Sequence, residues 1–280
     1  MRKTKSWRTA DDSRPTPGII NDPTRYPATR FFDNLSFIGT RGACCFLLET
    51  SAGLVLLDCI NPGQPFIDMI ETGIRELGYR PEELIAIMIT HGHGDHWGES
   101  SYLKKKYGCK LYMNEVDYRN AQNLPDRAPW KNYDGELDGY LEDMGVYTFG
   151  DTAVTTVHTP GHTPGSMSFL VPVTDEGRPH MLSIWDGSGV KTPDADIDAY
   201  LASVEKYKKI CKEYHVDCSA QTHPFIDNGI QKLELVRTIA RGVQNPFLIG
   251  EEGNEYFLNA MKESAEREKI IRAQRAAQKA

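Results

Sequence analysis

The stretch Thr90-His91-Gly92-His93-Gly94-Asp95-His96-Trp97-Gly98 decides more about this chain than any other part of its sequence. Three imidazoles and one carboxylate stand within six consecutive positions, and glycines between them let the backbone bend at low steric cost. The apolar run at 84–89 comes directly before and predicts a buried strand. We therefore expect a strand that ends in a tight loop and presents His91, His93, Asp95 and His96 together. Zinc accepts such ligands, as do iron and manganese.

Composition narrows the class of protein. The chain has 280 residues, with 40% apolar and 25% charged residues, which is typical of a globular protein. Its net charge of −7 argues against a surface for nucleic acid or anionic membranes. The start of the chain is basic but lacks an apolar stretch, so we expect no secretory signal peptide and a cytoplasmic protein. The six cysteines form no CxxC pair and are expected to be reduced core residues.

Strand-like and helix-like segments alternate along the chain, which predicts the α/β class. We expect an extended N-terminal arm over residues 1–30 and a single domain over 31–280 that ends in a C-terminal helix. The segment 120–147 is acidic and aromatic, and reads either as a flap that borders a site or as a surface loop with packed rings. The strands are expected at 32–38, 43–49, 54–58, 84–89, 110–113, 154–157, 166–171, 181–185 and 219–222, and the helices at 65–77, 100–107, 197–213, 229–241 and 251–278.

Three further polar residues follow apolar strands. His162 stands in a turn rich in proline and glycine, Asp186 ends the strand at 181–185, and His223 closes the strand at 219–222. In α/β proteins, sites are assembled at strand ends. Together with the first stretch they give five histidines and two aspartates, enough for two metals. The remaining histidines at 158, 180 and 215 stand outside this pattern and are expected to have no role in the site.

The motifs together resemble the metallo-β-lactamase superfamily. His91-x-His93-x-Asp95-His96 is similar to its signature, and Asp58, His162, Asp186 and His223 match its other motifs in order. The resemblance spans roughly residues 30–265. It implies an αββα sandwich of two mixed β-sheets flanked by helices, with the site along one edge. It also implies that Asp58 supports the site from behind the ligands.

Within that superfamily the closest likeness is to subclass B3, on the runs 161–166 and 245–247. This likeness implies two Zn²⁺ ions, with iron or manganese as other possibilities. One ion would bind His91, His93 and His162, and the other Asp95, His96 and His223. Asp186 is open: it bridges the metals in lactonase and glyoxalase II relatives but stands aside in B3 enzymes. The two serines that usually follow this aspartate in B3 β-lactamases are Gly187 and Gly189 here, with Ser188 between them.

The resemblance implies a dinuclear zinc hydrolase, in which a hydroxide generated at the metals attacks a small cyclic or activated carbonyl compound. Asp95 would orient that hydroxide. A β-lactam is a possible substrate; a lactone or a glyoxalase II-like thioester is the alternative. Trp97 either lines the pocket or packs under the loop, and Ser188 is a candidate substrate contact. A mononuclear iron persulfide dioxygenase, a nuclease or phosphodiesterase, and a binding protein with a vestigial site are weaker alternatives. We expect a small-molecule substrate and neither nucleic acid nor membrane as partner, with the oligomeric state open.

Overall fold

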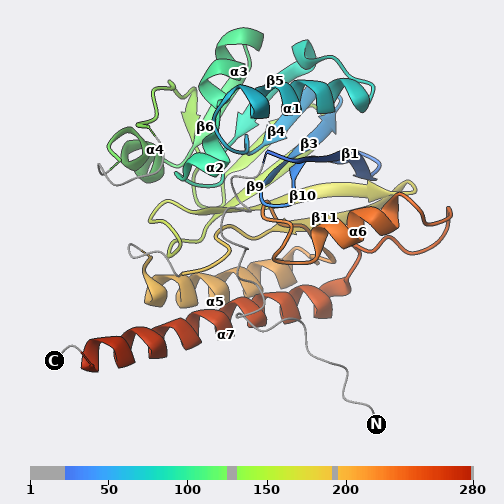
Figure 1. The fold of residues 1–280 in the computed structure, drawn as a ribbon. Coiled ribbons are helices and arrows are strands. Elements are labelled where there is room, and N and C mark those ends of the chain that lie inside the picture. Colours follow the sequence, from blue (N-terminus) through green and yellow to red (C-terminus); the bar gives the residue numbers. More distant parts are fainter. Residues whose placement is uncertain (1–22, 125–130, 191–194, 279–280) are drawn as a thin grey trace.

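Two β-sheets lie face to face, and helices cover the outer face of each sheet (Figure 1). The computed structural model describes residues 23–124, 131–190 and 195–278. The expected αββα sandwich is confirmed. Among the described residues, no helix is long and apolar enough to cross a membrane.

The first sheet has seven strands in chain order, antiparallel from β1 to β4 and parallel from β4 to β7. The parallel half places the ends of β4 and β5 side by side, which brings Asp58 next to Thr90. The strands are β1 (Arg25–Phe32), β2 (Leu35–Thr40), β3 (Cys44–Thr50), β4 (Gly53–Leu57), β5 (Leu84–Met88), β6 (Lys110–Met113) and β7 (Gly139–Tyr140).

The second sheet has five strands in the order β12-β11-β10-β9-β8. All neighbours are antiparallel except β11 and β12, which are parallel. The strands are β8 (Val146–Phe149), β9 (Thr152–His158), β10 (Met167–Asp175), β11 (Arg178–Ile184) and β12 (Cys218–Ser219).

The helices divide between the two outer faces. Helices α1 and α3 pack on the first sheet, whereas α5 and α7 pack against each other below the second sheet (Figure 1). The helices are α1 (Gln64–Glu76), α2 (Gly94–Trp97), α3 (Ser100–Tyr107), α4 (Glu115–Gln122), α5 (Ile197–Glu213), α6 (Gly229–Val236) and α7 (Gly250–Ala277), with a 3-10 turn at Pro81–Glu83.

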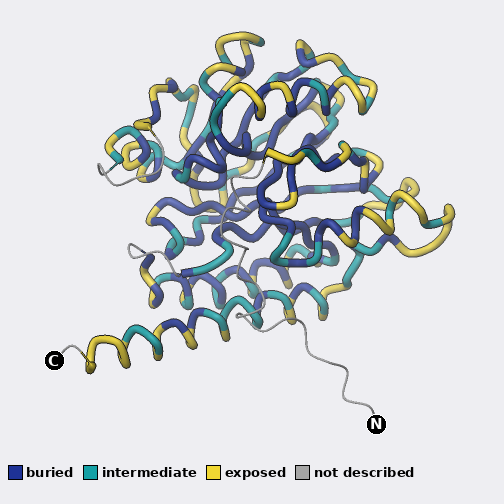
Figure 2. The backbone as a smooth tube through the Cα atoms, viewed as in Figure 1, coloured by how far each residue is buried: buried dark blue, intermediate teal, exposed yellow. Residues whose placement is uncertain are grey.

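The central strands are buried on both faces (Figure 2). In β3, Phe46 and Leu48 face the second sheet, whereas Cys45 and Leu47 face the helices. This alternation follows from the two-residue period of a strand, and it explains why these strands are continuous apolar runs in the sequence. All six cysteines are buried and unpaired, as expected.

The prediction of one strand over 32–38 is wrong. Residues 33 and 34 form the turn of a hairpin between β1 and β2. The Asn34 side chain accepts the Thr174 N–H at 3.1 Å and donates to the Pro172 carbonyl at 3.2 Å, so β10 holds the turn in place. A short polar Asp-Asn pair suits such a turn, and the apolar residues around it hid the signal.

Three other segments differ from expectation. Residues 25–30 of the expected arm form most of β1, while residues 1–22 lie outside the described part. The helix expected at 229–241 ends at Val236. The segment 120–147 contains the end of α4, then β7 and the start of β8, with residues 125–130 outside the described part.

Candidate metal centre

The motif stretch is anchored by Asp58 at the end of β4. Its Oδ1 accepts the Thr90 N–H and its Oδ2 accepts the Thr90 hydroxyl, both at 2.8 Å. Asp58 is fully buried and has a φ of 65°, a backbone conformation that costs free energy in a residue other than glycine or asparagine. The Asp58 carboxylate therefore fixes the backbone just after β5, while the backbone of Asp58 itself is strained.

Beyond Thr90 the chain forms one helical turn rather than an open loop. His93 is the N-cap of α2, and Asp95 and His96 lie within that helix. The helix can end where it does only because residue 98 is glycine. Gly98 has a φ of 39°, and a β-carbon there would lie 2.4 Å from the Cys59 carbonyl oxygen. This close contact seats α2 against the end of β4 and so fixes the direction of the motif side chains.

A first group of donor atoms consists of three imidazoles. His93 Nδ1 lies 3.0 Å from His91 Nε2 and 3.1 Å from His162 Nε2. The ligand atoms of the three residues all lie within 4.8 Å of one another. Three ring nitrogens that converge in this way suit one borderline cation such as zinc.

A second group consists of one carboxylate and two imidazoles. His96 Nε2 lies 3.2 Å from His223 Nε2, and Asp95 Oδ2 lies 3.6 Å from His223 Nε2 and 4.0 Å from His96 Nε2. The two groups adjoin, because the His91 and His96 rings are 3.9 Å apart between centroids. The structure thus brings six of the seven expected ligands together as two neighbouring triads, a candidate dinuclear metal centre.

The ring nitrogen that points away from the group has its own partner in His91, His96, His162 and His223. Such contacts fix the tautomer and the ring orientation of metal-binding histidines, so the donor set fits a divalent metal. The pairs are His91 Nδ1 with Asp186 Oδ1 at 2.8 Å, His96 Nδ1 with Asp58 Oδ2 at 2.7 Å, His162 Nδ1 with the Gly189 carbonyl at 2.6 Å, and His223 Nδ1 with the Gly42 carbonyl at 2.8 Å.

Asp186 does not join either group of donor atoms. Its side chain is fully buried and one oxygen is committed to the far nitrogen of His91. The prediction that Asp186 is a metal ligand is therefore wrong. The structure places Asp186 behind His91, which matches the alternative in which this aspartate binds neither metal. The other oxygen of Asp186, Oδ2, is buried and has no hydrogen-bond partner among the described residues.

Burial and charge give the two groups different protonation behaviour. Burial lowers the pKa of His91, His93 and His223, and it lowers that of His162 to about 3. Burial also acts against protonated His96, but the carboxylates of Asp58 and Asp95 outweigh it and raise its pKa to about 9. The first group is thus neutral and ready for a cation at pH 7, whereas His96 holds a proton in the metal-free protein.

Asp117 is a part of the site that the sequence did not reveal. This α4 residue is 1% exposed, and its carboxylate accepts the Gly92 N–H at 2.8 Å and the Gly165 N–H at 2.7 Å. It also accepts the Thr163 hydroxyl at 2.5 Å. Asp117 therefore ties the motif stretch to the turn that carries His162. One aspartate in a polar helix gives no signal of this role in a sequence.

Trp97 packs under the motif stretch instead of lining the site. It is 6% exposed, its Nε1 donates to the Gly92 carbonyl at 3.1 Å, and its ring lies 5.0 Å from the Tyr133 ring. The substrate contact considered for Trp97 is therefore corrected to the packing alternative. Tyr133 belongs to the aromatic segment 120–147, so this described part of the segment packs against Trp97 of the motif stretch.

The structure explains the glycine at one of the two positions where B3 β-lactamases usually carry serine. Gly187 has a φ of 80°, and a β-carbon there would lie 2.3 Å from the His162 β-carbon. A serine at this position would displace His162. Ser188 is half-buried and lines a cavity whose lining includes none of the six donor residues. The histidines at 158, 180 and 215 contact other groups, namely the Pro164 carbonyl, Asp217 and Glu251.

Comparison with known proteins agrees with this geometry. A sequence model of the metallo-β-lactamase superfamily matches residues 38–175. An N-acyl homoserine lactonase of a Bacillus species is 28% identical over 200 residues, which cover 59% of this chain and 75% of the lactonase. The exodeoxyribonuclease WalJ of Streptococcus pneumoniae is 34% identical over 110 residues, but these cover only 38% of this chain and 37% of the nuclease.

Among solved structures, BJP-1, a subclass B3 metallo-β-lactamase of Bradyrhizobium japonicum, matches with a TM-score of 0.80. The two chains are 23% identical, and the match covers 92% of this chain and 98% of the other. At that identity the likeness concerns the fold.

Proposed function

The chain belongs to the metallo-β-lactamase superfamily and is a metallo-hydrolase, and we propose that it is a dinuclear zinc enzyme that opens lactones. The observation that carries this proposal is the pair of adjoining donor groups, each complete with three ligands. A mononuclear iron dioxygenase would not need the second group, Asp95 with His96 and His223. A binding protein with a vestigial site would not need either group intact.

The six candidate ligands would have different roles. His91, His93 and His162 would hold one zinc ion, and Asp95, His96 and His223 the other. When bound, the two ions supply a water of lowered pKa and polarise the carbonyl under attack. Asp95 would accept the proton that this water loses, because its carboxylate is the one anionic group within the two donor groups.

Two buried carboxylates behind the ligands position them. Asp58 accepts the proton on His96 Nδ1 and leaves Nε2 free to face the second zinc. Asp186 does the same for His91 on the side of the first zinc. Both aspartates would therefore be positioning residues, and their loss would weaken metal binding without removing a ligand.

A lactone is favoured over a β-lactam by two observations. The lactonase relative aligns over 75% of its own length, whereas the likeness to the B3 enzyme rests on the fold. In addition, Gly187 leaves no room for a serine beside His162. The site thus lacks hydroxyl groups at both positions where B3 β-lactamases usually carry them. β-Lactam hydrolysis remains the second candidate, supported by the match in fold.

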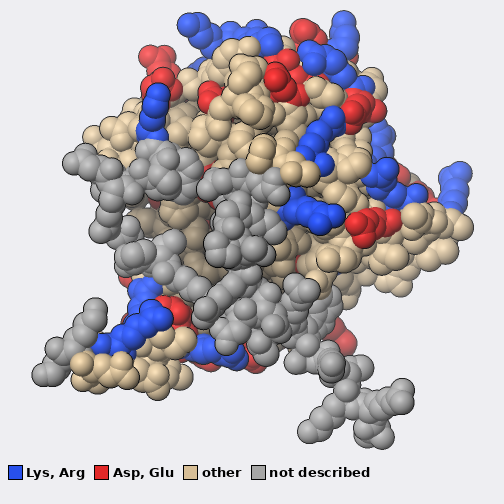
Figure 3. Space-filling model, in the orientation of Figure 1, with Lys and Arg blue, Asp and Glu red and all other residues tan. Residues whose placement is uncertain are grey.

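Nucleic acid is not proposed as a substrate. The chain carries a net charge of −7, and on the face seen in Figure 3, Lys and Arg side chains are interspersed with Asp and Glu. Nucleases need positive charge to hold a phosphate backbone. The similarity to the nuclease WalJ covers little more than a third of that protein.

A substrate panel tests the proposal. The zinc-loaded protein is assayed against an N-acyl homoserine lactone, nitrocefin and a glutathione thioester, and its zinc content is measured. We expect two equivalents of zinc and the highest kcat/KM for the lactone. Preference for nitrocefin would move the assignment to a β-lactamase, and a single equivalent of iron without zinc would overturn it.

A further inference from the structure

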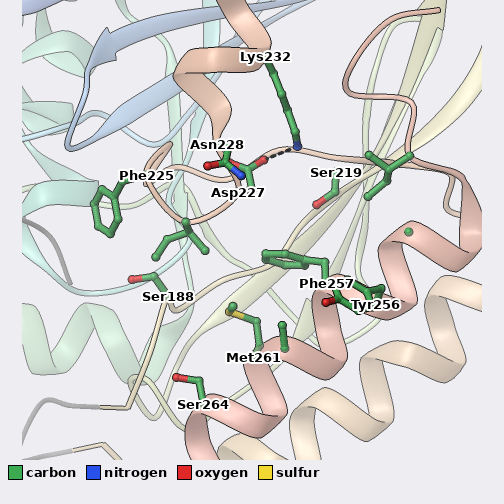
Figure 4. Close-up of a pocket in the computed structure, with 14 residues that line it drawn as sticks. Ser188, Ser219, Phe225, Asp227, Asn228, Lys232, Tyr256, Phe257, Met261 and Ser264 are labelled. Carbon is green, nitrogen blue, oxygen red and sulfur yellow. Dashed lines mark hydrogen bonds and ion pairs between the residues drawn. The ribbon is translucent and has the colours of Figure 1, made fainter. Parts of the chain in front are cut away.

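A cavity of about 370 Å³ lies between the loop that follows His223 and helix α7. In Figure 4, Phe257 and Met261 project from α7 toward Ser188, and Asp227 and Lys232 close the opposite side. Binding pockets for small molecules have volumes of roughly 300–1,000 Å³. This cavity is therefore large enough for part of a substrate, and no metal-binding role accounts for it.

The cavity adjoins the candidate metal centre through two of its lining residues. The Phe225 ring packs on the His223 ring, with 5.4 Å between centroids. Ser188 stands between Gly187, which touches His162, and Gly189, whose carbonyl accepts from His162 Nδ1 at 2.6 Å. A substrate whose carbonyl lies at the metals would thus have the cavity within reach on the side of His162 and His223.

The lining is apolar and carries no net charge. Most of the surface comes from carbon atoms, and the apolar lining residues include Phe225, Ile226, Ile249, Phe257, Ala260 and Met261. The charged residues that line it, Asp227 and Lys232, form an ion pair of 2.9 Å and are both buried. Lys232 Nζ also lies 5.1 Å from the centre of the Phe247 ring. The pair has no net charge, so a charged ligand that entered the cavity would lose hydration without gaining a counter-charge.

From these observations we propose that the cavity binds the uncharged acyl chain of the substrate. This proposal rests on the proposed hydrolase function and narrows the substrate to a neutral compound with an alkyl arm of several methylenes. Long, flexible Met261 lets the cavity adapt to chains of different length. A compound with only a short arm would use the metals without entering the cavity.

Two variants on one helix provide the test. Ala260 is half-buried on α7 and lines the cavity, so Ala260→Phe fills it. Glu263 lies on the same helix, is exposed and is not a lining residue, so Glu263→Phe is the matched control. Each protein is assayed with butyryl, octanoyl and decanoyl homoserine lactones. Binding of the non-hydrolysable decanoyl and butyryl lactams is measured by calorimetry.

We expect the KM of the wild type to fall roughly fourfold for each methylene that enters the cavity. Ala260→Phe should raise the KM for the decanoyl lactone on the order of 10-fold and weaken the decanoyl lactam by the same factor. It should leave the butyryl substrate and the zinc content unchanged. Glu263→Phe should behave as wild type.

The outcomes separate this proposal from the proposed function. Hydrolysis that does not depend on chain length, or an equal loss in both variants, would overturn the acyl pocket while leaving the hydrolase intact. Binding of the decanoyl lactam that depends on Ala260, without any lactone hydrolysis, would support the pocket and refute the lactonase. Tighter binding of a carboxylate-terminated chain than of the neutral one would also overturn the proposal.

Discussion

The two donor groups of the candidate metal centre are built alike and charged differently. The first has three imidazoles, and Asp186 stands behind His91; the second has Asp95 among its donors, and Asp58 stands behind His96. The three donors of the first group are therefore neutral when they bind a metal, whereas Asp95 gives the second group a negative charge. If zinc were held by both groups, the neutral first group would suit polarisation of the carbonyl, and Asp95 in the second group would accept the proton.

Loss of a ligand should have the largest effect. His93→Ala removes a donor from the first group and Asp95→Ala removes one from the second. Each should lower kcat/KM by more than about 1000-fold, since each metal contributes several kcal/mol to the transition state. Zinc analysis should show one equivalent in each variant, and circular dichroism should show a folded protein. Wild-type turnover by both variants with metal bound would refute the dinuclear mechanism.

Substitution of Asp58 or Asp186, the carboxylates that contact ligand histidines, should have the second-largest effect. Asp58→Asn should weaken zinc in the second group, and Asp186→Asn should weaken zinc in the first, each by roughly 10- to 100-fold. Competition with a chelator measures both affinities. If both variants lose the same zinc ion, Asp58 and Asp186 do not each support a different group, and the contrast drawn between the two groups is wrong.

Asp117 supports both groups at once through Gly92 and the His162 turn. Asp117→Asn replaces one acceptor oxygen by an NH₂ group that faces backbone N–H donors, which should cost about 1–3 kcal/mol of unfolding free energy. Urea unfolding measures this loss. Glu115→Gln, on the exposed face of the same helix, is the control and should change stability by less than about 0.5 kcal/mol.

The pH dependence of the metal-free protein should distinguish His96 from the other histidines of the two groups, because its slope has the opposite sign. His162 has a folded pKa of about 3, below its unfolded value near 6.5, so its contribution makes stability rise with pH between these values. His96 has a folded pKa of about 9, so its contribution is complete below pH 6.5 and is lost as pH rises through 9.

One proton contributes a slope of at most about 1.4 kcal/mol per pH unit, and the lowered pKa values of His91, His93 and His223 add to the rise below pH 6.5. Urea unfolding of the metal-free protein from pH 5 to pH 10 would measure the rise and the fall. His96→Gln should remove the fall between pH 6.5 and about 8 and leave the rise below pH 6.5. Above about pH 8 the six buried cysteines add a fall of their own, because burial raises their pKa values. An unchanged fall between pH 6.5 and about 8 in that variant would assign the proton to another group.

Much of the site could be predicted because its residues are clustered in the sequence. The motif stretch places four candidate ligands within six positions after an apolar run, and such a run must be a buried strand. His162 and His223 were found because each follows a strand, and strand ends meet at one edge of a sheet. Segments without such periodicity, such as the turn at residues 33 and 34, were misjudged.

Strand and helix periodicity in the sequence predicted the α/β class, and the motifs carried the resemblance that implied the αββα sandwich and the candidate metal ligands. Ligand type and periodicity are local properties, so a sequence records them. Only the tertiary structure gave the distances at which the donors converge, placed Asp186 behind His91, and packed Trp97 under the motif stretch. It alone showed Asp117 between the two loops and the neutral cavity beside α7. These features depend on contacts between residues far apart in the chain, whose directions no local pattern records.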